Sequence, residues 1–175
     1  LGENPYDCSK SVADRVAQMY AKSFGVRLAV TRCGNVYGGG DLNFSRLVPE
    51  TIRAIFLKRN PKIRSDGLYR RDYVHVSDIV GAYIKTAEAL IKNEIQPGDA
   101  FNFGTNTPRT ALEVTKKLIE LTGSKKNPII LATARYEIRD QYLDSTKARK
   151  ILGWTPVVQF EDGLRSTINW YSKYF

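Results

Sequence analysis

Two residues near the start of the chain have the types and the spacing for proton transfer. Tyr6 and Lys10 are four residues apart, so on a helix their side chains lie on one face about one turn apart. A phenol with an ordinary pKa of about 10 is a poor base at neutral pH unless a nearby cation stabilises the phenolate, and Lys10 is such a cation. Pairs of this kind are also common on solvated helix faces, so the spacing alone favours that ordinary role.

The residues around this pair predict a helix, a strand and a glycine-rich loop. Apolar residues recur at helical spacing over 5–24, and Gly25 suits the end of that helix. Residues 26–33 are rich in Val, Leu and Ala, which predicts a short buried strand. Gly34 interrupts the strand, and three consecutive glycines follow at 38–40. A glycine-rich loop is therefore expected directly after a strand.

The rest of the chain predicts further alternation of helices and strands. Helices are expected at 44–57, 78–92, 111–122, 145–152 and 160–174. Strands are expected at 62–65, 69–76, 100–103 and 128–132. The Asp66-Gly67 pair predicts a hairpin between the first two of these strands, and Ser77 and Thr110 are expected to cap the helices that follow them. The alternation favours an α/β fold, whereas the pairing of the strands stays open.

Charge and composition narrow the functional class. The 27 basic and 18 acidic residues give a net charge of +9, which favours an anionic partner. The basic residues are scattered and do not form a stripe interleaved with aromatic residues, so we expect no nucleic-acid partner. No apolar run approaches the roughly 20 residues of a membrane helix, so no membrane partner is expected. Cys8 and Cys33 have neither metal-site nor disulfide spacing, which predicts a reducing compartment, the cytoplasm, and no metal.

Four segments of the sequence carry a more specific pattern. Residues 6–10 have the form Y-x-x-x-K, and residues 32–38 have the form R-x-x-N-x-Y-G. Residues 71–78 read R-D-Y-x-H-V-x-D, and residues 144–154 are similar to a closing D-x-S-K-A…L-G-W. In this order the segments resemble the motifs of the extended short-chain dehydrogenases/reductases, the family of nucleotide-sugar epimerases and dehydratases. The resemblance spans nearly the whole chain.

This resemblance implies a fold and a division into domains. The expected fold is α/β, the C-terminal part of an extended Rossmann-type fold with its smaller substrate-binding domain. Residues 1–40 would be the tail of the dinucleotide-binding domain, and residues 41–175 mostly the nucleotide-sugar-binding portion, with one or two elements returning to the Rossmann sheet. The sequence contains neither the family's glycine-rich turn nor its dehydration acid/base pair. We therefore expect a fragment that is inactive alone, and a homodimer in the full-length enzyme.

The resemblance also implies the residues that act on the sugar and the cofactor. Tyr6 would take the proton from the sugar 4-hydroxyl. Lys10 would lower the pKa of that phenol and bind the nicotinamide ribose of NAD. Cys33 would line the nicotinamide, and Asn35 would contact the sugar diphosphate. Without the resemblance, Asn35 is an ordinary turn residue before a glycine loop.

The nucleotide would be held by a second group of residues. Leu47 and Val48 match the backbone segment that approaches the ribose or base. Arg64 matches the position that holds the base, and Arg71 matches an arginine that binds the diphosphate. Asn43 and Arg46 are expected to add contacts.

Three points stay open on the sequence alone. Arg70 stands beside Arg71, so the register of the diphosphate arginine is uncertain by one residue. Arg135 and Arg139 compete for a second phosphate-binding position. His75, the single histidine, is expected to be structural rather than catalytic.

Within the family, the segments at 33–43, 46–49 and 63–67 are most similar to the dehydratases that act on CDP-glucose. The implied reaction is the NAD-dependent conversion of CDP-glucose to CDP-4-keto-6-deoxyglucose. The alternatives within the family are another dehydratase or a 4-epimerase for dTDP- or UDP-sugars. From a different class, a non-enzymatic nucleotide or nucleic-acid binding module also agrees with the positive charge.

Overall fold

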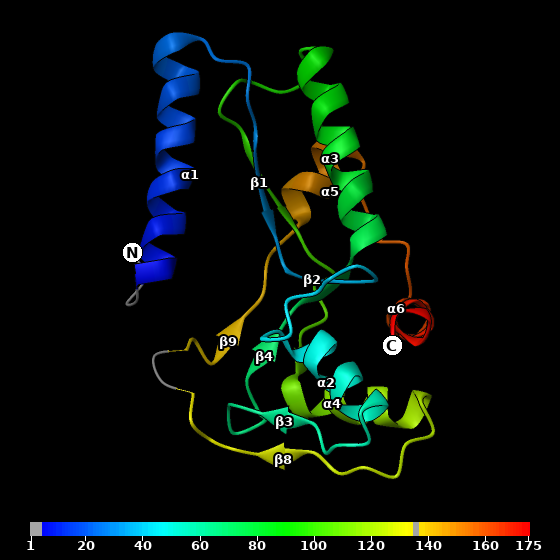
Figure 1. Ribbon diagram of the computed structural model, residues 1–175. Helices are drawn as coiled ribbons and strands as arrows, with labels where there is room; N and C mark the ends of the chain where they lie inside the picture. The colour runs from blue at the N-terminus through cyan, green and yellow to red at the C-terminus, as the bar shows by residue number, and fades with distance from the viewer. Residues whose placement is uncertain (1–4, 135–136) are drawn as a thin grey trace.

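The computed structural model describes residues 5–134 and 137–175 of the chain. Its helices are α1 (Pro5–Phe24), α2 (Leu47–Phe56), α3 (Val76–Ile91), α4 (Ala111–Leu121), α5 (Thr146–Leu152) and α6 (Phe160–Tyr174). Its strands are β1 (Val30–Cys33), β2 (Asn35–Tyr37), β3 (Lys62–Ile63), β4 (Arg70–Arg71), β5 (Tyr73–His75), β6 (Ala100–Phe103), β7 (Arg109–Thr110), β8 (Ile129–Ile130) and β9 (Asp140–Gln141). Among the described helices, none combines the length and the apolar character that crossing a bilayer requires. Figure 1 shows these elements in an upper and a lower body.

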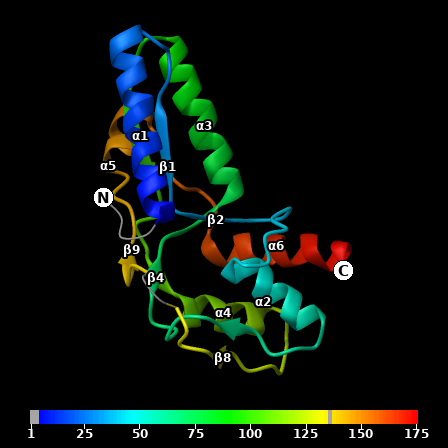
Figure 2. The ribbon, with the colours of Figure 1, turned by 60° about the vertical axis from the view of Figure 1, so that its left-hand side comes forward.

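The upper body is built around the parallel pair of β1 and β6, in which Val30 lies opposite Ala100. The pair lies between α1 and α3 in both views (Figures 1 and 2). Its core consists of the buried residues Val74, Ile79, Ala82, Ala89, Ile95, Phe101, Phe103, Ala148, Leu152 and Trp154. Late segments of the chain therefore pack beside an early strand. The division into domains after residue 40 stays a prediction.

The lower body packs α2, α4 and α6 together and adds the parallel pair of β3 and β8 (Figure 1). Its core consists of the buried residues Tyr37, Val48, Ile52, Tyr73, Val114, Leu118, Leu164 and Tyr171. The parallel pair of β2 and β5 lies between the two bodies and places Asn35 opposite Tyr73. Beside it, β4 pairs with β7 in antiparallel and with β9 in parallel fashion.

The predicted hairpin over residues 62–76 is wrong. The turn itself forms, since the Leu68 N–H donates to the Asp66 side chain at 2.8 Å and Gly67 has a φ of 86°. Its two flanks do not pair with each other, because β3 pairs with β8 and the second flank divides into β4 and β5. Partners far along the chain thus outcompete the local turn, as is common for strands.

One of the two predicted helix caps is confirmed. Thr110 caps α4 in a full capping box: its side chain accepts from the Glu113 N–H at 3.1 Å, and the Glu113 carboxylate accepts from the Thr110 N–H at 2.7 Å. Ser77 does not cap α3, because the helix begins at Val76, two residues earlier than expected. The cap is His75, whose Nδ1 accepts from the Ser77 N–H at 3.3 Å. This contact agrees with a structural role for His75.

The Asp72 carboxylate ties the two bodies together between β4 and β5. The residue is 1% exposed. One carboxylate oxygen accepts from the N–H and the hydroxyl of Thr105, and the other accepts from the Asn106 N–H at 3.1 Å. The Asp72 carbonyl accepts from the Asn35 N–H, and a Cβ at Gly34 would lie 2.7 Å from that carbonyl, so a glycine is needed there. Asp72 therefore fixes β2, β4 and β5 against the loop after β6.

We predict that Asp72→Ala lowers the free energy of unfolding by about 2–4 kcal/mol, because it removes a buried carboxylate that accepts three hydrogen bonds from Thr105 and Asn106. Urea unfolding followed by circular dichroism measures this loss. The matched control is Asp162→Ala, at an exposed position of α6, which should change the free energy by less than about 0.5 kcal/mol. Equal effects of the two substitutions would contradict the anchoring role of Asp72.

Candidate active site

A large pocket of about 1030 Å³ opens where the two bodies meet. Its walls come from the start of α1, the segment from β1 to β2, the first turn of α2, the loops around β3 to β5, and residues 137 and 141. It brings together nearly all of the residues that the sequence singled out, namely Tyr6, Cys33, Asn35, Leu47, Val48, Arg64 and Arg71. Lys10 does not line the pocket itself, but it lies beside Tyr6.

The tyrosine and lysine occupy the first two turns of α1, as the spacing predicts. The Lys10 ammonium lies 5.7 Å from the centroid of the Tyr6 ring, within the range of a cation–π contact. Tyr6 is 68% exposed at the pocket mouth. The helix thus holds a phenol and a cation one turn apart on the same face.

The end of β1 and the start of β2 supply Cys33 and Asn35 to the pocket lining. Cys33 is half-buried, and this burial raises the pKa of its thiol, while a hydrogen bond from Tyr83 acts in the opposite direction. Asn35 is not a turn residue, as the residues alone would suggest. It begins β2, pairs with Tyr73 and stays exposed at the pocket wall, because the backbone of Asp72 holds it in an extended strand.

The first turn of α2 forms another wall. The turn before it is held by its own side chains: the Asn43 N–H donates to Asp41, and the Ser45 N–H donates to Asn43 at 3.1 Å. Arg46 forms an ion pair of 3.1 Å with Asp41. Leu47 and Val48 follow, and Val48 is also part of the lower core. Asn43 and Arg46, the residues expected to add contacts, both line the pocket.

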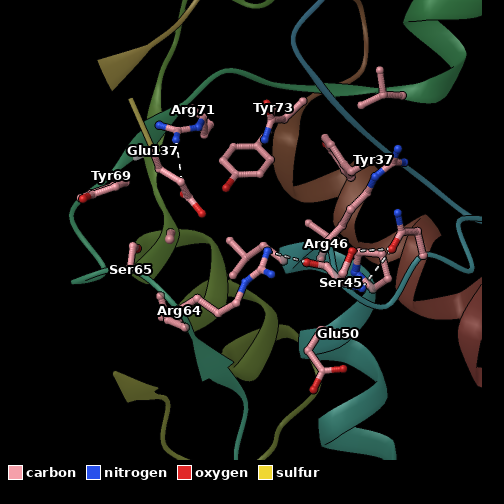
Figure 3. Close-up of a pocket in the computed structure, with 18 of the residues that line it drawn as sticks. Tyr37, Ser45, Arg46, Glu50, Arg64, Ser65, Tyr69, Arg71, Tyr73 and Glu137 are labelled. Atoms are coloured by element: carbon pink, nitrogen blue, oxygen red, sulfur yellow. Dashed lines mark hydrogen bonds and ion pairs between the residues drawn. The ribbon is translucent and has the colours of Figure 1, made fainter. Parts of the chain in front are cut away.

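Two arginines approach the pocket from opposite directions (Figure 3). Arg64 donates from Nη2 to the Ser45 carbonyl at 3.0 Å, which ties the loop after β3 to the turn before α2. Arg71 has a side chain only 14% exposed, and its Nη1 donates to the carbonyls of Arg70 and Arg139 at 2.8 and 3.1 Å. Its Nη2 lies 3.6 Å from a carboxylate oxygen of Glu137.

The structure shows which of the candidate phosphate-binding arginines in its described part line the pocket. Arg71, and not Arg70, lines the pocket. Arg139 is exposed and contributes its carbonyl to Arg71 rather than lining the pocket. Arg135 lies outside the described residues.

Sequence reasoning missed several pocket residues, among them Tyr73 and Glu137, which lie near Arg71. Tyr73 follows Arg71 by two residues, so their alternation in an extended segment was the available signal. Glu137 had no comparable signal, because its approach to Arg71 depends on the chain returning near β4. The charged lining residues are Asp7, Arg46, Glu50, Arg53, Lys62, Arg64, Arg71 and Glu137. Cations outnumber anions among them, which suits an anionic ligand.

Within the described part of the chain, no cluster of His, Cys, Asp and Glu is arranged to hold a metal ion. A protein-family model described as GDP-mannose 4,6 dehydratase matches residues 2–167. The chain belongs to this family. It is a family of nucleotide-sugar dehydratases and epimerases within the extended short-chain dehydrogenases/reductases, and it is NAD-dependent. This confirms the family and the Rossmann-like α/β fold that the four sequence motifs imply.

Individual members of the family are similar over the whole chain. The dTDP-D-glucose 4,6-dehydratase of Mus musculus is 30% identical over 178 residues, which cover 98% of this chain and 48% of the mouse protein. The dTDP-glucose 4,6-dehydratase of Bacillus anthracis, solved in complex with NAD, superposes with a TM-score of 0.85 at 31% identity, covering 98% of this chain and 53% of that chain.

A UDP-glucose 4-epimerase is similar to the same degree. The Thermotoga maritima enzyme, solved with UDP-glucose, superposes with a TM-score of 0.88 at 31% identity, covering 97% of this chain and 54% of that chain. This chain therefore spans about half the length of the relatives that it matches. Both reaction types, dehydration and epimerisation, occur among its relatives.

We predict that iodoacetamide modifies Cys8 several-fold faster than Cys33 at about pH 8. Cys8 is exposed, whereas Cys33 is half-buried with a raised thiol pKa, and only the thiolate reacts. The rate at Cys33 should therefore continue to rise at pH values where an ordinary thiol has already reached its plateau. Peptide mass spectrometry measures both rates, and a Cys8→Ser variant isolates Cys33. Equal rates at the two thiols would contradict the burial of this wall.

Proposed function

We propose that this chain supplies the proton-transfer pair and the nucleotide-sugar pocket of an NAD-dependent 4,6-dehydratase that converts CDP-glucose to CDP-4-keto-6-deoxyglucose. One observation carries the proposal: a single pocket gathers Tyr6 at its mouth with Arg64 and Arg71 in its walls. We also propose that a preceding part of the protein supplies the glycine-rich turn and the acid/base pair for dehydration. This chain alone would then be inactive.

The residues present fit one end of NAD. Lys10 offers an ammonium beside Tyr6, and Cys33 offers a half-buried side chain in the lining of the same pocket as Tyr6, which suits the nicotinamide and its ribose. The sequence has no glycine-rich turn after an opening strand to hold the pyrophosphate. Bound NAD supplies a hydride acceptor for sugar C4 and a donor for C6.

Tyr6 would remove the proton from the sugar 4-hydroxyl. Loss of hydride from C4 makes that oxygen a carbonyl oxygen, so its proton must leave in the same step. Lys10 would stabilise the phenolate by its charge and keep it available near neutral pH. The resulting 4-ketone acidifies C5, which prepares the loss of water across C5 and C6. The epimerisation alternative shares the oxidation at C4 and differs only in the later steps.

The arginines would hold the nucleotide diphosphate. Arg71 is anchored through Nη1, so its Nη2 remains for an anion in place of Glu137, and a guanidinium suits phosphate better than an ammonium does. Asn35 would contact the sugar diphosphate from β2. Leu47 and Val48 would approach the ribose or base, and Arg64 would donate to the base. Cytosine offers a carbonyl and a ring nitrogen as acceptors, which supports CDP.

The proposed partner is a second copy of the same protein, as a homodimer of the full-length enzyme. The α1 helix supports this proposal, because it leaves Val12, Val16, Met19, Tyr20 and Phe24 between 44% and 73% exposed. Such a row of apolar side chains on one helix is typical of a surface that is covered in an assembly.

In the complete protein that carries this chain, we predict that Tyr6→Phe lowers kcat by about 10²–10⁴-fold while CDP-glucose binding is retained, because only the proton acceptor is lost. Lys10→Met should move the pH profile of kcat toward higher pH, since the phenolate loses its cation. NADH absorbance in single-turnover experiments follows the oxidation at C4. The control is Tyr20→Phe, on the same helix but outside the pocket lining. Full activity of Tyr6→Phe would refute the proposed role.

We also predict that the complete protein binds CDP-glucose more tightly than UDP-glucose or dTDP-glucose, and that Arg64→Ala removes this preference by removing the donor to the base. Isothermal titration calorimetry at constant salt measures the affinities, with the exposed Arg59→Ala as control. Tighter binding of UDP- or dTDP-glucose would favour the other family members. Binding of any polynucleotide with a steep loss on added salt would instead favour the nucleic-acid module.

A further inference from the structure

Tyr73 presents an unused hydroxyl to the pocket. The residue is 7% exposed, and within the described part of the chain its hydroxyl has no hydrogen-bond partner. The only side-chain polar atom among the described residues that is fully enclosed without a partner is Oδ1 of Asn102, so the Tyr73 hydroxyl must remain open to the pocket. Figure 3 shows the ring projecting into the pocket with its hydroxyl toward the centre.

The backbone holds this hydroxyl on the same side as Arg71. Arg71, Asp72 and Tyr73 form an extended segment, in which alternate side chains point to opposite sides. Because the Asp72 carboxylate is buried against Thr105 and Asn106, Arg71 and Tyr73 both face the pocket. Strand β2 pairs with β5 and places Asn35 opposite Tyr73. A phenol and a guanidinium thus approach one region of the pocket from neighbouring positions.

The protonation state of Tyr73 makes it a donor. Burial raises its pKa to about 12, against the opposing effect of the Arg71 charge. A group with a raised pKa stays protonated up to that value, so the phenol is neutral over the whole physiological range. Tyr73 therefore has a proton to offer in a hydrogen bond and is unsuited to act as a base, in contrast to the role proposed for Tyr6.

We propose that the Tyr73 hydroxyl donates a hydrogen bond to an oxygen of the ligand's diphosphate, beside Arg71. This inference rests on the proposed function of the pocket. The Tyr73 hydroxyl is open to the pocket and has no acceptor among the described residues, so a ligand oxygen in the pocket can accept its proton. An ionised phosphate oxygen next to a guanidinium is the strongest acceptor for such a donor. Tyr73 would thus bind the diphosphate and position it, without taking part in proton transfer.

The test is Tyr73→Phe in the complete protein, with CDP-glucose, CDP and cytidine as ligands. We expect the affinities for CDP-glucose and CDP to fall alike, by about 10–100-fold, because both contain the diphosphate. Cytidine affinity should stay unchanged. The midpoint of urea unfolding should also stay unchanged, because the free protein loses no hydrogen bond. Calorimetry gives the first two affinities, and NMR titration gives that of cytidine.

The matched control is Tyr171→Phe, a buried tyrosine outside the pocket lining whose hydroxyl already donates to the Asp41 carbonyl. It should lower the unfolding midpoint and leave all three affinities unchanged, which is the reverse of the pattern for Tyr73→Phe. The inference is overturned if Tyr73→Phe leaves CDP affinity unchanged, weakens CDP-glucose alone, or weakens cytidine equally. If the unaltered protein binds no nucleoside diphosphate sugar at all, the proposed function itself fails.

Discussion

The pocket depends on one buried carboxylate. Asp72 accepts hydrogen bonds from the backbone of Thr105 and Asn106, while its own carbonyl accepts from the Asn35 N–H. These bonds lock an extended segment between the two bodies of the molecule. Since side chains alternate along such a segment, burying Asp72 directs Arg71 and Tyr73 into the pocket. The guanidinium and the phenol that line the pocket here are thus held by a residue that does not line it.

The lining of the pocket combines Tyr6 from α1 with the guanidinium groups of Arg64 and Arg71. The exposed pair of Tyr6 and Lys10 lies at the mouth, on a helix whose own spacing brings phenol and cation together. The positively charged walls lie around Arg64 and Arg71, where backbone carbonyls orient the guanidinium groups. In the free protein, Glu137 neutralises part of this charge. An anionic ligand would replace that internal partner, so the pocket walls already carry the electrostatic pattern that such a ligand requires.

Two tyrosines that line the pocket, Tyr6 and Tyr73, differ strongly in burial. Tyr6 is 68% exposed, and the Lys10 ammonium lies 5.7 Å from the centroid of its ring. Tyr73 is buried, and its pKa rises to about 12, so it keeps its proton. The sequence motifs point to the first tyrosine and pass over the second, although both belong to matched segments. The two tyrosines differ in burial, and the burial of a side chain depends on how the chain folds.

The sequence by itself determined what depends on neighbours along the chain: the bounds of α1, the capping box of Thr110 and Glu113, the α/β alternation, and the ordered motifs that identify the family. Helical turns and caps join residues three or four apart, so the local sequence is sufficient for them. Only the tertiary structure decided the partners of β3, β4 and β5, the place of Asn35 in a strand, and the approach of Glu137 to Arg71. Those pairings join distant segments, and the pattern within any one segment does not specify its partner.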